Sequence, residues 1–477
     1  MKFEVLENVN LLKKYHKTLV FDYTEYPTKS NWSQEMGSSS YVSALSEWLN
    51  GGGDQENSLF YVHTPFCEQL CYFCLCSKEI TKDYEKVKDY LYNVLFKEID
   101  MLAATITNVG RKPKFTEIYF GGGSPTYYNQ EDFANLIEKI KSVVDFSQVD
   151  TFTLEVDPRR VDVERMKFYA TMGVNRISLG IQDFDPEVQE EINRLQPFEL
   201  VKALLTDEVR ALFPVIAFDL LIGLPKQTPE SIKSTMDKVV ELQPTELQTM
   251  YVHYKPDVRK YMTRMVRSQP LPDFFDRKAI FVQASTTLLE SGYQRAGFES
   301  YSLPNAGLTK AMDEGKAYYN SIGTQKGAAN NFVAVGSSAH GVFGDFYFQN
   351  FYERDVYTKH VQSGHFPIYR GYKLNNEDHI RRDIIKKTRT YFEVKFEDVE
   401  TKYGINFKSH FSSELALLLE FEKDGLVSVM PDRFKVTELG KHFSPQICEV
   451  FDEYANRVPF NPNVHVPSAI SQRSAAR

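Results

Sequence analysis

The feature that most constrains this chain is a short run of cysteines. Cys67, Cys71, Cys74 and Cys76 follow an apolar segment, and Cys448 is the only other cysteine. A single free cysteine commonly behaves as a small buried hydrophobic residue, so Cys448 needs no special explanation. Thiolates are soft ligands that select iron–sulfur clusters, zinc or copper(I), and a loop this short can aim several sulfurs at one point. We therefore predict a metal-binding loop.

Three kinds of cysteine site compete for this loop. A disulfide is disfavoured because nothing else indicates secretion and the chain is long enough to bury a core without one. Structural zinc commonly takes two separated ligand pairs, and no second Cys/His pair has that spacing. The spacing C-x3-C-x2-C of Cys67, Cys71 and Cys74 suits three irons of a [4Fe–4S] cluster, with the fourth iron open to a ligand. We predict this cluster ahead of zinc and of a purely structural role, and leave Cys76 without an assigned role.

The wider string around the loop resembles a known family. Cys67-x3-Cys71-x2-Cys74 resembles the signature of the radical S-adenosylmethionine (SAM) superfamily. With Pro65-Phe66 before it and Phe73-Cys74-x-Cys76 closing it, the string resembles oxygen-independent coproporphyrinogen III oxidases, and the resemblance runs from about residue 23 to about residue 454. Wider relatives include heme chaperones, anaerobic heme-degrading enzymes and class C radical SAM methyltransferases. The resemblance implies a [4Fe–4S] cluster and SAM as cofactors, and a reducing partner such as flavodoxin or ferredoxin.

Composition narrows the class of protein. Lys and Arg number 56 against 64 Asp and Glu, a net charge of −8, which argues against a general nucleic-acid binder. No apolar run is long enough to span a membrane, and the N-terminus does not begin a signal peptide. Together with free thiols, these features predict a cytoplasmic protein that acts on a small planar molecule, with access to a membrane surface if that molecule is a quinone.

Strand and helix patterns alternate after the cysteine loop. Strands are predicted at residues 59–62, 116–120, 152–156, 176–181, 215–222 and 247–252, with helical stretches between them. Repeated βα units imply a parallel sheet, although periodicity does not say whether it is open or curled. The family resemblance implies an α/β fold: a partial (β/α)6 radical SAM barrel, with the cluster loop after the first strand.

We expect four regions along the chain. Residues 1–54 form an N-terminal arm, and residues 55–370 form the barrel with a C-terminal extension. Residues 371–458 read as helices followed by a hairpin, a small winged-helix-like domain. A DNA-binding role is disfavoured because the resemblance implies that this domain caps the barrel. The tail at 459–477, rich in Pro, Asn and Ser, is expected to be disordered.

Several positions match SAM-binding positions of the family. The turn containing Gly122, Gly123 and Ser124 follows a strand, where glycine lets the backbone approach a ligand closely. The resemblance implies that this turn binds the amino group of the cluster-bound SAM, and that Glu155 contacts the same molecule. The ligands that it implies for a second SAM are Gln182, Arg194 and Asp219, with the rings of Tyr61 and Phe73 near both SAM molecules. Arg suits a carboxylate, and Asp suits a ribose or an ammonium group.

The substrate side departs from the oxidase pattern at four places. The replacements are Tyr251-Val252-His253-Tyr254 for Asn-Tyr-Ala-His, residues 297–302 for Gly-Met-Asp-His-Phe-Ala, Tyr319-Asn320 for Phe-Gln, and Ser338-Ala339-His340-Gly341 for Ser-Ala-Ile-Ser. His253 and His340 match positions that face the ligand cavity, so both are candidate catalytic residues, and either one could serve as a base.

These departures set the order of the functional hypotheses. Because the SAM side is kept and the substrate side differs, we expect class C methyl transfer to an sp2 carbon of a planar substrate. Menaquinone, methylated at C-8, is the example that the resemblance suggests. The alternative is oxygen-independent oxidative decarboxylation of coproporphyrinogen III to protoporphyrinogen IX. A third hypothesis is a heme-trafficking protein that keeps the cluster fold.

Overall fold

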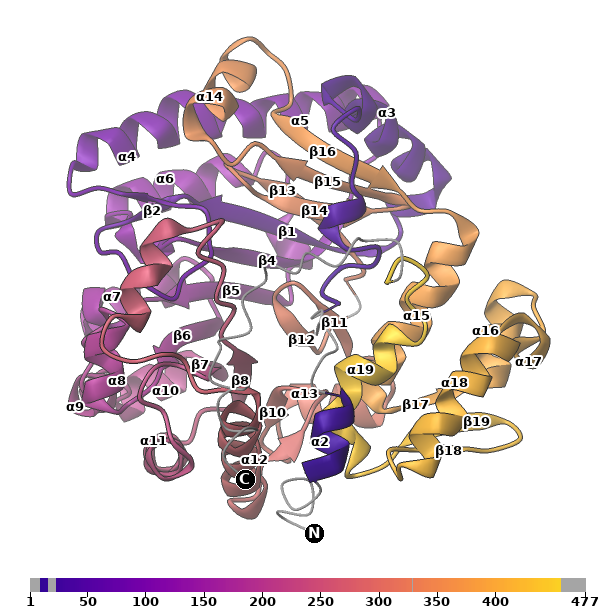
Figure 1. The fold of residues 1–477 in the computed structure, drawn as a ribbon. Helices are drawn as coiled ribbons and strands as arrows, with labels where there is room; N and C mark the ends of the chain where they lie inside the picture. Colours follow the sequence, from indigo (N-terminus) through magenta and orange to yellow (C-terminus); the bar gives the residue numbers. More distant parts are fainter. Residues whose placement is uncertain (1–8, 16–22, 328, 456–477) are drawn as a thin grey trace.

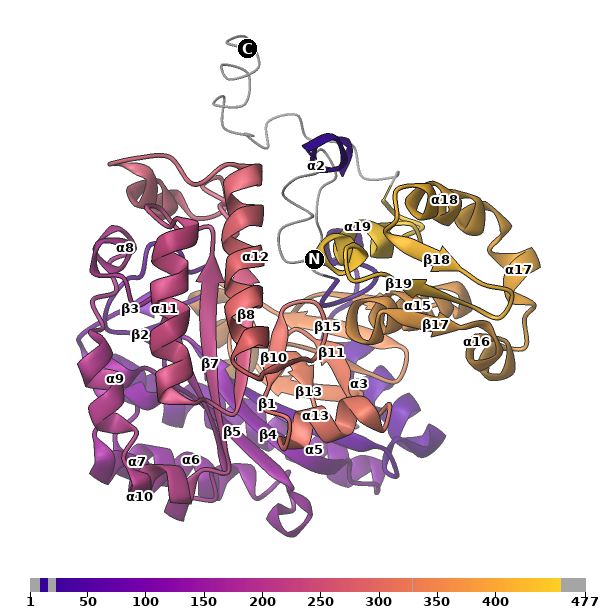
Figure 2. The same cartoon turned by 90° about the horizontal axis from the view of Figure 1, so that it is seen from below.

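The computed structural model describes residues 9–15, 23–327 and 329–455 of the 477-residue chain. The predicted tail at 459–477 lies outside the described residues. Figures 1 and 2 show a curved sheet with helices on its outer face, and a smaller domain beside it formed by the last part of the described chain. No helix among the described residues has the length and apolarity needed to cross a membrane.

Six parallel strands form the centre of the sheet in the order in which they occur along the chain. They are β1 (Asn57–Thr64), β4 (Lys114–Gly122), β5 (Thr151–Val156), β6 (Arg176–Gln182), β7 (Val215–Ile222) and β8 (Glu246–Tyr251). Nearly every residue of these strands is buried, as expected for parallel strands covered on both faces. This arrangement confirms the predicted partial (β/α)6 barrel.

Helices between the strands cover the outside of the barrel. They are α4 (Tyr84–Tyr90), α5 (Phe96–Val109), α6 (Gln130–Ile140), α7 (Val163–Thr171), α8 (Pro186–Glu191), α9 (Phe198–Leu204), α10 (Asp207–Leu212), α11 (Pro229–Leu242) and α12 (Phe274–Glu290). Local sequence sets where they begin. The Asn129 side chain accepts the Asp132 N–H at the start of α6, and Thr228 and Ser231 form a capping box at the start of α11.

The sheet continues beyond the six barrel strands on both edges, which the strand pattern did not predict. One edge adds β13 (Asn331–Val335), parallel to β1, followed by antiparallel β14 (His340–Phe343), β15 (Phe346–Asn350) and β16 (Ile368–Lys373). The other edge adds β10 (Ser300–Ser302) and β9 (Gln294–Arg295). A separate hairpin, β11 (Tyr318–Asn320) with β12 (Gly323–Gln325), lies between the barrel and the C-terminal domain in Figure 1.

A buried carboxylate ties the β13–β16 extension to the barrel. Glu98 of α5 accepts hydrogen bonds from the Gly336 N–H and the Asn350 side-chain amide, both at 2.7 Å, and from the Tyr357 hydroxyl. Burial raises the pKa of Glu98 to about 7. Three donors on one buried acceptor fix where β13 ends, and therefore where the following residues, including His340, enter the interior.

Residues 33–48 of the N-terminal arm contact this same extension. Helix α3 (Ser38–Trp48) buries Tyr41 and Trp48, which pack against Phe343. Ser33 forms a β-bridge with Gly371 at the end of the extension. Residues 23–32 are thereby held across the barrel opening, with the short helix η1 (Lys29–Asn31) among them.

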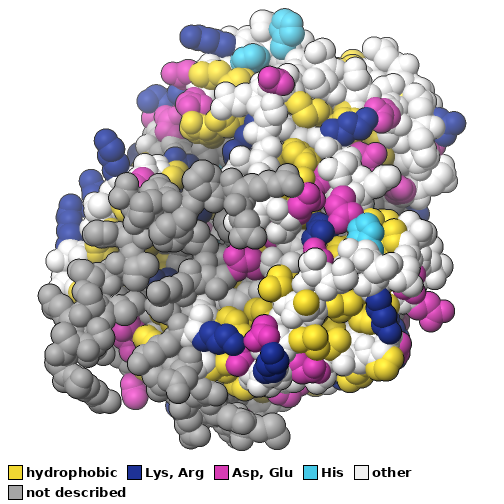
Figure 3. All heavy atoms as spheres, turned by 45° about the vertical axis from the view of Figure 1, so that its right-hand side comes forward, with side chains coloured by type: hydrophobic (Ala, Val, Ile, Leu, Met, Phe, Trp, Pro, Cys, Tyr) yellow, Lys and Arg dark blue, Asp and Glu magenta, His cyan; other side chains and the backbone are white. Residues whose placement is uncertain are grey.

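The C-terminal domain has its own apolar core and joins the barrel through polar contacts. Its helices are α15 (Asn376–Tyr391), α16 (Phe396–Tyr403), α17 (Phe407–His410), α18 (Ser412–Lys423) and α19 (Ser444–Glu449). Its sheet has three strands in the order β17 (Glu393–Lys395), β19 (Arg433–Val436), β18 (Val427–Val429), one more than the hairpin that the sequence indicated. In the described part of the face shown in Figure 3, acidic, basic and apolar side chains are interspersed.

A buried arginine connects this domain to the barrel. The Arg389 side chain, from α15, is 1% exposed, and its Nη2 donates to Glu299 Oε1 at 3.0 Å and to the Tyr319 hydroxyl at 2.9 Å. From the barrel side, Lys278 of α12 donates a hydrogen bond to the His442 carbonyl, with a distance of 2.7 Å between Nζ and the oxygen. The domain therefore docks through specific charged and polar groups as well as apolar packing.

Replacing Arg389 with Met should destabilise the protein strongly. Removing one member of a buried ion pair costs about 3–5 kcal/mol, because the attraction between Arg389 and Glu299 no longer offsets the cost of burying the charge that remains. We expect a lower thermal midpoint and a lower denaturant midpoint. Glu299→Gln in the Arg389→Met background should recover part of the loss. Arg433→Met, which removes surface ion pairs, should change stability by about 1 kcal/mol or less. Equal losses in both single variants would contradict this interpretation.

Candidate active site

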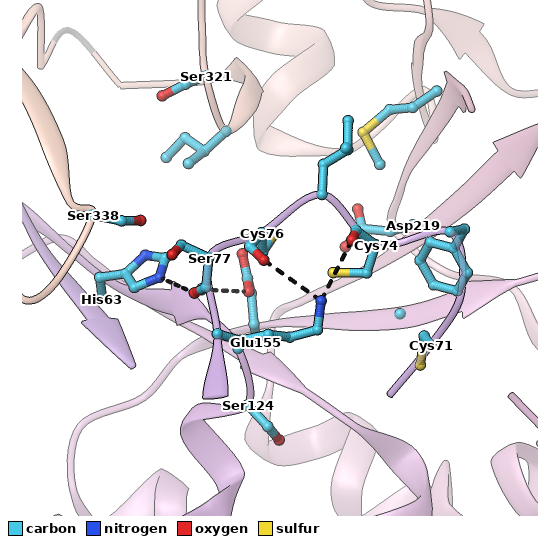
Figure 4. Close-up of a pocket in the computed structure, with 18 of the residues that line it drawn as sticks. His63, Cys71, Cys74, Cys76, Ser77, Ser124, Glu155, Asp219, Ser321 and Ser338 are labelled. Atoms are coloured by element: carbon cyan, nitrogen blue, oxygen red, sulfur yellow. Dashed lines mark hydrogen bonds between the residues drawn. The ribbon is translucent and has the colours of Figure 1, made fainter. Parts of the chain in front are cut away.

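A cavity of about 1240 Å³ opens at the carboxyl ends of the barrel strands. All the barrel strands or the loops that follow them contribute side chains, as is usual for barrels of this type. The N-terminal arm contributes Thr24 and Lys29, the β11–β12 hairpin contributes Tyr319 and Asn320, and the start of β14 contributes His340. Figure 4 shows the part of this cavity around the cysteine loop.

The cysteine loop is held in place by the protein chain. Short strands β2 (Phe66–Cys67) and β3 (Glu79–Ile80) pair in parallel at its two ends. Between them, the Tyr72 N–H donates to the Ile192 carbonyl at 3.0 Å, and the Asn193 side chain donates to the Leu70 carbonyl at 2.7 Å. The Tyr261 hydroxyl donates to the Cys74 carbonyl at 2.5 Å. These bonds fix the path of the loop from three sides.

The four loop cysteines all line the cavity, and two arginines lie next to one of them. Arg194 Nη1 lies 3.7 Å from Cys71 Sγ, and Arg159 Nη2 lies 3.9 Å from it. Among the described residues, no three His, Cys, Asp or Glu side chains converge as they would on one metal ion. A [4Fe–4S] cluster needs no such convergence because each cysteine binds a different iron. The donor set at Cys67, Cys71 and Cys74 therefore fits a cluster.

The glycine turn is bonded directly to the cysteine strand. Gly123 N–H donates to the Thr64 carbonyl at 2.7 Å, and Ser124 N–H donates to the Phe66 carbonyl at 2.8 Å. A Cβ on Gly123 would lie 2.5 Å from the Phe66 oxygen, and a Cβ on Gly122, whose φ is +106°, would meet the His63 ring at 2.6 Å. Close backbone approach therefore requires glycine at 123, and the His63 ring together with a positive φ requires it at 122.

Two carboxylates lie deeper along the same wall. Glu155 accepts from the Tyr119 hydroxyl at 3.0 Å and from Gly122 N–H at 3.1 Å, so its side chain points at the glycine turn. Asp219 accepts from the Ser178 hydroxyl at 2.8 Å. Burial, together with the proximity of Asp219, raises the pKa of Glu155 to about 7, and burial also raises the pKa of Asp219. Figure 4 shows Glu155 near Cys76 and Ser77, and Asp219 near Cys74.

Gln182 and Arg194 meet over Gly180, on the same side as Cys71. Arg194 donates from Nη2 and Nε to the Gly180 carbonyl, at 2.6 and 3.2 Å, and lies 3.6 Å from Asp157. Gln182 has a φ of +67°, and its buried Oε1 has no hydrogen-bond partner among the described residues. A buried acceptor without a partner, in a cavity wall, is a position where a ligand donor is expected. The structure thus brings together the predicted residues Gln182, Arg194 and Asp219.

The predicted aromatic residues lie on different parts of the wall. Tyr61 stacks near Tyr119 with ring centroids 5.8 Å apart, and its hydroxyl lies 3.1 Å from His63 Nδ1. Phe73 is half-buried on the cysteine loop, and it packs in the apolar cluster that contains Met262. His63 Nε2 lies 3.1 Å from the Ser77 carbonyl, an acceptor, so Nε2 carries the hydrogen and Nδ1 accepts from Tyr61. Burial lowers the pKa of His63 to about 4.

The two candidate catalytic histidines differ in their surroundings. His253 lies in the loop after β8 and lines the cavity. His340 Nε2 lies 2.6 Å from Glu25 Oε1, and Lys29 Nζ lies 3.2 Å from that oxygen and 3.3 Å from the His340 ring. Burial and the Lys29 charge lower the pKa of His340, whereas Lys29 and His340 hold the pKa of Glu25 well below its usual range despite burial. The imidazole therefore lies beside both a carboxylate and an ammonium group.

The resemblance implies that the N-terminal segment at residues 23–28, which includes Glu25, lies beside the active site. Sequence reasoning missed Lys29 and Arg370, which carry no recognisable motif. Arg370 donates to Gln349 Oε1 at 2.8 Å and to the Lys29 carbonyl at 2.9 Å. His63 was visible in the string before the cysteines, two residues after Tyr61 on the same strand face. That period-two spacing was the signal that could have identified it.

Replacing Gly123 with Ala should separate the glycine turn from the cysteine strand. The new methyl group would overlap the Phe66 and Thr64 carbonyl oxygens, so the two backbone hydrogen bonds at this junction should be lost. We expect a lower thermal midpoint and reduced iron incorporation during anaerobic reconstitution. Gly51→Ala is the matched control because a Cβ there meets nothing within 4 Å. Normal iron content in Gly123→Ala would contradict the proposed tight junction.

Comparison with known proteins identifies the relatives of this chain. The profile of the radical SAM superfamily matches residues 61–239. Oxygen-independent coproporphyrinogen III oxidase of Pseudomonas aeruginosa is 32% identical over 434 residues, which cover 91% of this chain and 93% of that protein. The enzyme of Escherichia coli strain K12 is 32% identical over 437 residues, covering 91% and 92%. The solved structure of the coproporphyrinogen III oxidase of Escherichia coli, described as a radical SAM enzyme, superposes with a TM-score of 0.84 at 32% identity, covering 93% of this chain and 98% of that one.

These relatives overturn the sequence-based preference for methyl transfer to menaquinone or another planar substrate. That prediction gave decisive weight to four substrate-side stretches, which include His253, residues 297–302, Tyr319-Asn320 and His340. In the structure these stretches form part of the wall of one cavity, whereas the similarity to oxidases extends over nine-tenths of the chain. Changes at a few wall positions alter the shape and hydrogen bonding of a pocket, and they do not by themselves identify a different reaction.

The cysteine loop, the barrel and the C-terminal domain all have counterparts in relatives of nearly equal length. The chain is therefore a radical SAM enzyme, a class that implies a [4Fe–4S] cluster and SAM, and it belongs to the oxygen-independent coproporphyrinogen III oxidase family.

Proposed function

We propose that this protein catalyses the oxygen-independent oxidative decarboxylation of coproporphyrinogen III to protoporphyrinogen IX. The observation that carries the proposal is that the cysteine loop opens into the same large cavity as a set of cationic side chains, in a chain similar to such oxidases over 91% of its length. The cavity, at about 1240 Å³, exceeds the range of about 300–1000 Å³ that is usual for small-molecule sites. It therefore has room for a tetrapyrrole as well as SAM.

The cofactor roles follow the residues already placed on the cavity wall. Cys67, Cys71 and Cys74 hold the cluster, and Gly122, Gly123, Ser124 and Glu155 contact the SAM beside it. Gln182, Arg194 and Asp219 hold a second SAM, with Tyr61 and Phe73 as aromatic walls. When bound, the cluster and SAM supply a carbon radical that removes a hydrogen atom from a substrate propionate. The Gln182 Oε1 atom supports the second site because it is buried without a partner among the described residues.

The substrate carboxylates are matched by cations on the cavity wall. Coproporphyrinogen III carries four propionates, and Lys29, Lys78, Arg259 and Arg370 all line the cavity. Within the described part of the chain, Lys78, Arg259 and Arg370 form no ion pair with an Asp or Glu, although each donates to oxygen atoms of the chain. Arg370 contacts Lys29 directly, because its guanidinium donates a hydrogen bond to the Lys29 carbonyl. These groups bind the propionates that do not react and so orient the one that does.

His340 contributes an imidazole to this wall. Its Nε2 lies 2.6 Å from Glu25 Oε1, and its Nδ1 lies 3.5 Å from Lys29 Nζ. Burial and the nearby Lys29 charge lower the pKa of His340. His253, on the loop after β8, is the second candidate for contact with the substrate. A one-electron donor such as flavodoxin or ferredoxin supplies the electron that the cluster needs.

Product analysis tests the proposed reaction. Anaerobically reconstituted protein with SAM, a reductant and coproporphyrinogen III should release CO2 and form protoporphyrinogen IX, with 5′-deoxyadenosine as the SAM product. Cys71→Ala should lose iron and all turnover because it removes a cluster ligand. Cys448→Ala is the control because Cys448 is buried in the C-terminal domain, where it donates to the Ile385 carbonyl. Unchanged coproporphyrinogen III with a fully loaded, SAM-cleaving enzyme would refute the proposal.

A second experiment tests the number of SAM sites. Asp219→Ala should weaken one of two SAM sites about ten- to hundredfold, because a hydrogen bond to a charged group contributes about 1.5–3 kcal/mol. Equilibrium titration of the reconstituted enzyme measures both affinities. Asp237→Ala, on the exposed face of α11, should leave them unchanged. A single SAM site in the unaltered enzyme would rule out the second one.

A further inference from the structure

One surface segment is strongly basic although the chain as a whole is acidic. Residues 255–267 carry Lys255, Arg259, Lys260, Arg264 and Arg267 against a single acid, Asp257, in a chain of net charge −8. The segment contains the short helix η7 (Lys260–Val266) and lies between β8 and α12. It belongs to none of the cofactor or substrate roles above, apart from Arg259.

The inner side of this segment is packed on the cysteine loop. Met262 and Met265 are completely buried, in an apolar cluster that also contains Tyr72, Phe73 and Leu75 of the loop. The Tyr261 hydroxyl donates to the Cys74 carbonyl at 2.5 Å, and Arg259 Nε donates to the Leu75 carbonyl at 3.4 Å. Segment and loop are therefore one packed unit.

The outer side of the segment is exposed and has surplus positive charge. Lys255, Lys260, Arg264 and Arg267 are exposed, and Val258 between them is 63% exposed. None of these four cations forms an ion pair with a described residue. The adjacent helix α8 carries Glu187, Glu190 and Glu191, and one lysine, Lys226, lies 3.6 Å from Glu187 and 3.1 Å from Glu191. Residues 255–267 have a net charge of +4 and α8 together with Lys226 has −2, so this region keeps a positive balance.

We infer that the face formed by Lys255, Val258, Lys260, Arg264 and Arg267 is the docking surface for an acidic one-electron carrier protein of the flavin or iron–sulfur type. The inference rests on the proposed cluster at Cys67, Cys71 and Cys74. A reduced carrier docked here faces the loop across the layer of Tyr261 and Met262. It gives up one electron, and the cluster gains one, with no bond made or broken.

Charge complementarity is the reason for choosing an acidic carrier. Oppositely charged patches raise association rates by about 10- to 1000-fold at low ionic strength, and the gain is lost as salt screens the charges. Val258, which lies between Lys255 and Lys260 in the sequence and also lines the cavity, gives a docked protein an exposed apolar contact on the same segment. An overall acidic enzyme would otherwise repel an acidic carrier, so a local basic face is what makes the encounter productive.

Reversing the charge of this face tests the inference. An acidic flavodoxin is the probe, and two variants are used, Lys255→Glu/Lys260→Glu and Arg264→Glu/Arg267→Glu. Stopped-flow absorbance gives the rate at which reduced flavodoxin reduces the cluster, and calorimetry gives the affinity for oxidised flavodoxin. In the unaltered enzyme, the reduction rate and the affinity for flavodoxin should both fall steeply as the salt concentration rises. Each variant should lose at least about tenfold in rate and affinity at low salt, and should lose the salt dependence.

Two comparisons separate docking from other effects. Lys202→Glu/Lys423→Glu makes the same change in net charge at exposed sites on other parts of the molecule, and should behave as the unaltered enzyme. Reduction by dithionite, which needs no docking, should be equal in all variants. Equal losses in the control pair, or no loss in either reversed pair, would overturn the docking surface. If the cluster proposal is wrong, dithionite will reduce no cluster in any variant. Calorimetry would still show whether flavodoxin binds to this face.

Discussion

Two backbone hydrogen bonds hold the two halves of the candidate site together. They run from Gly123 N–H to the Thr64 carbonyl and from Ser124 N–H to the Phe66 carbonyl, across the ends of β4 and β1. Because Cys67 follows Phe66 directly, these bonds fix the cysteine loop relative to the glycine turn and to Glu155 behind it. The approach is so close that neither Gly122 nor Gly123 leaves space for a Cβ. A cluster and a ligand bound beside it would therefore meet a preorganised wall.

The rest of the cavity is completed by segments distant in sequence. The arm supplies Glu25 and Lys29, the extension supplies His340 and Arg370, and the β11–β12 hairpin supplies Tyr319. Each is held by buried polar contacts outside the cavity: Glu98 fixes the extension, and Arg389 of the C-terminal domain fixes Tyr319 and Glu299. The C-terminal domain thus contacts residues of the cavity wall through the buried Arg389.

Charge is distributed unevenly between the interior and the surface. The chain has a net charge of −8, yet Lys29, Lys78, Arg259 and Arg370 face the cavity and a further group of cations lies outside the cysteine loop. Near the cluster position, Arg159 and Arg194 lie beside Cys71, while Glu155 and Asp219 lie further along the wall. Cations therefore lie beside Cys71 and the proposed substrate carboxylates. The positions proposed for SAM combine the acids Glu155 and Asp219 with Arg194, which suits a molecule that carries ammonium, sulfonium and carboxylate groups.

The sequence by itself determined the features that depend on local spacing. The C-x3-C-x2-C run predicted the loop, and alternating strand and helix patterns predicted six parallel strands. Both predictions were possible because ligand spacing and burial periodicity depend on residues that are close together in the sequence. The family resemblance supplied the barrel closure and brought Gln182, Arg194 and Asp219 to attention. Only the tertiary structure decided which distant residues share the cavity. Lys29 and His340 are 311 residues apart and meet because the arm crosses the barrel opening, which no local pattern encodes. The substrate preference was misjudged for the same reason, since a pocket is shaped jointly by many segments, and a few altered wall positions, considered singly, do not reveal its chemistry.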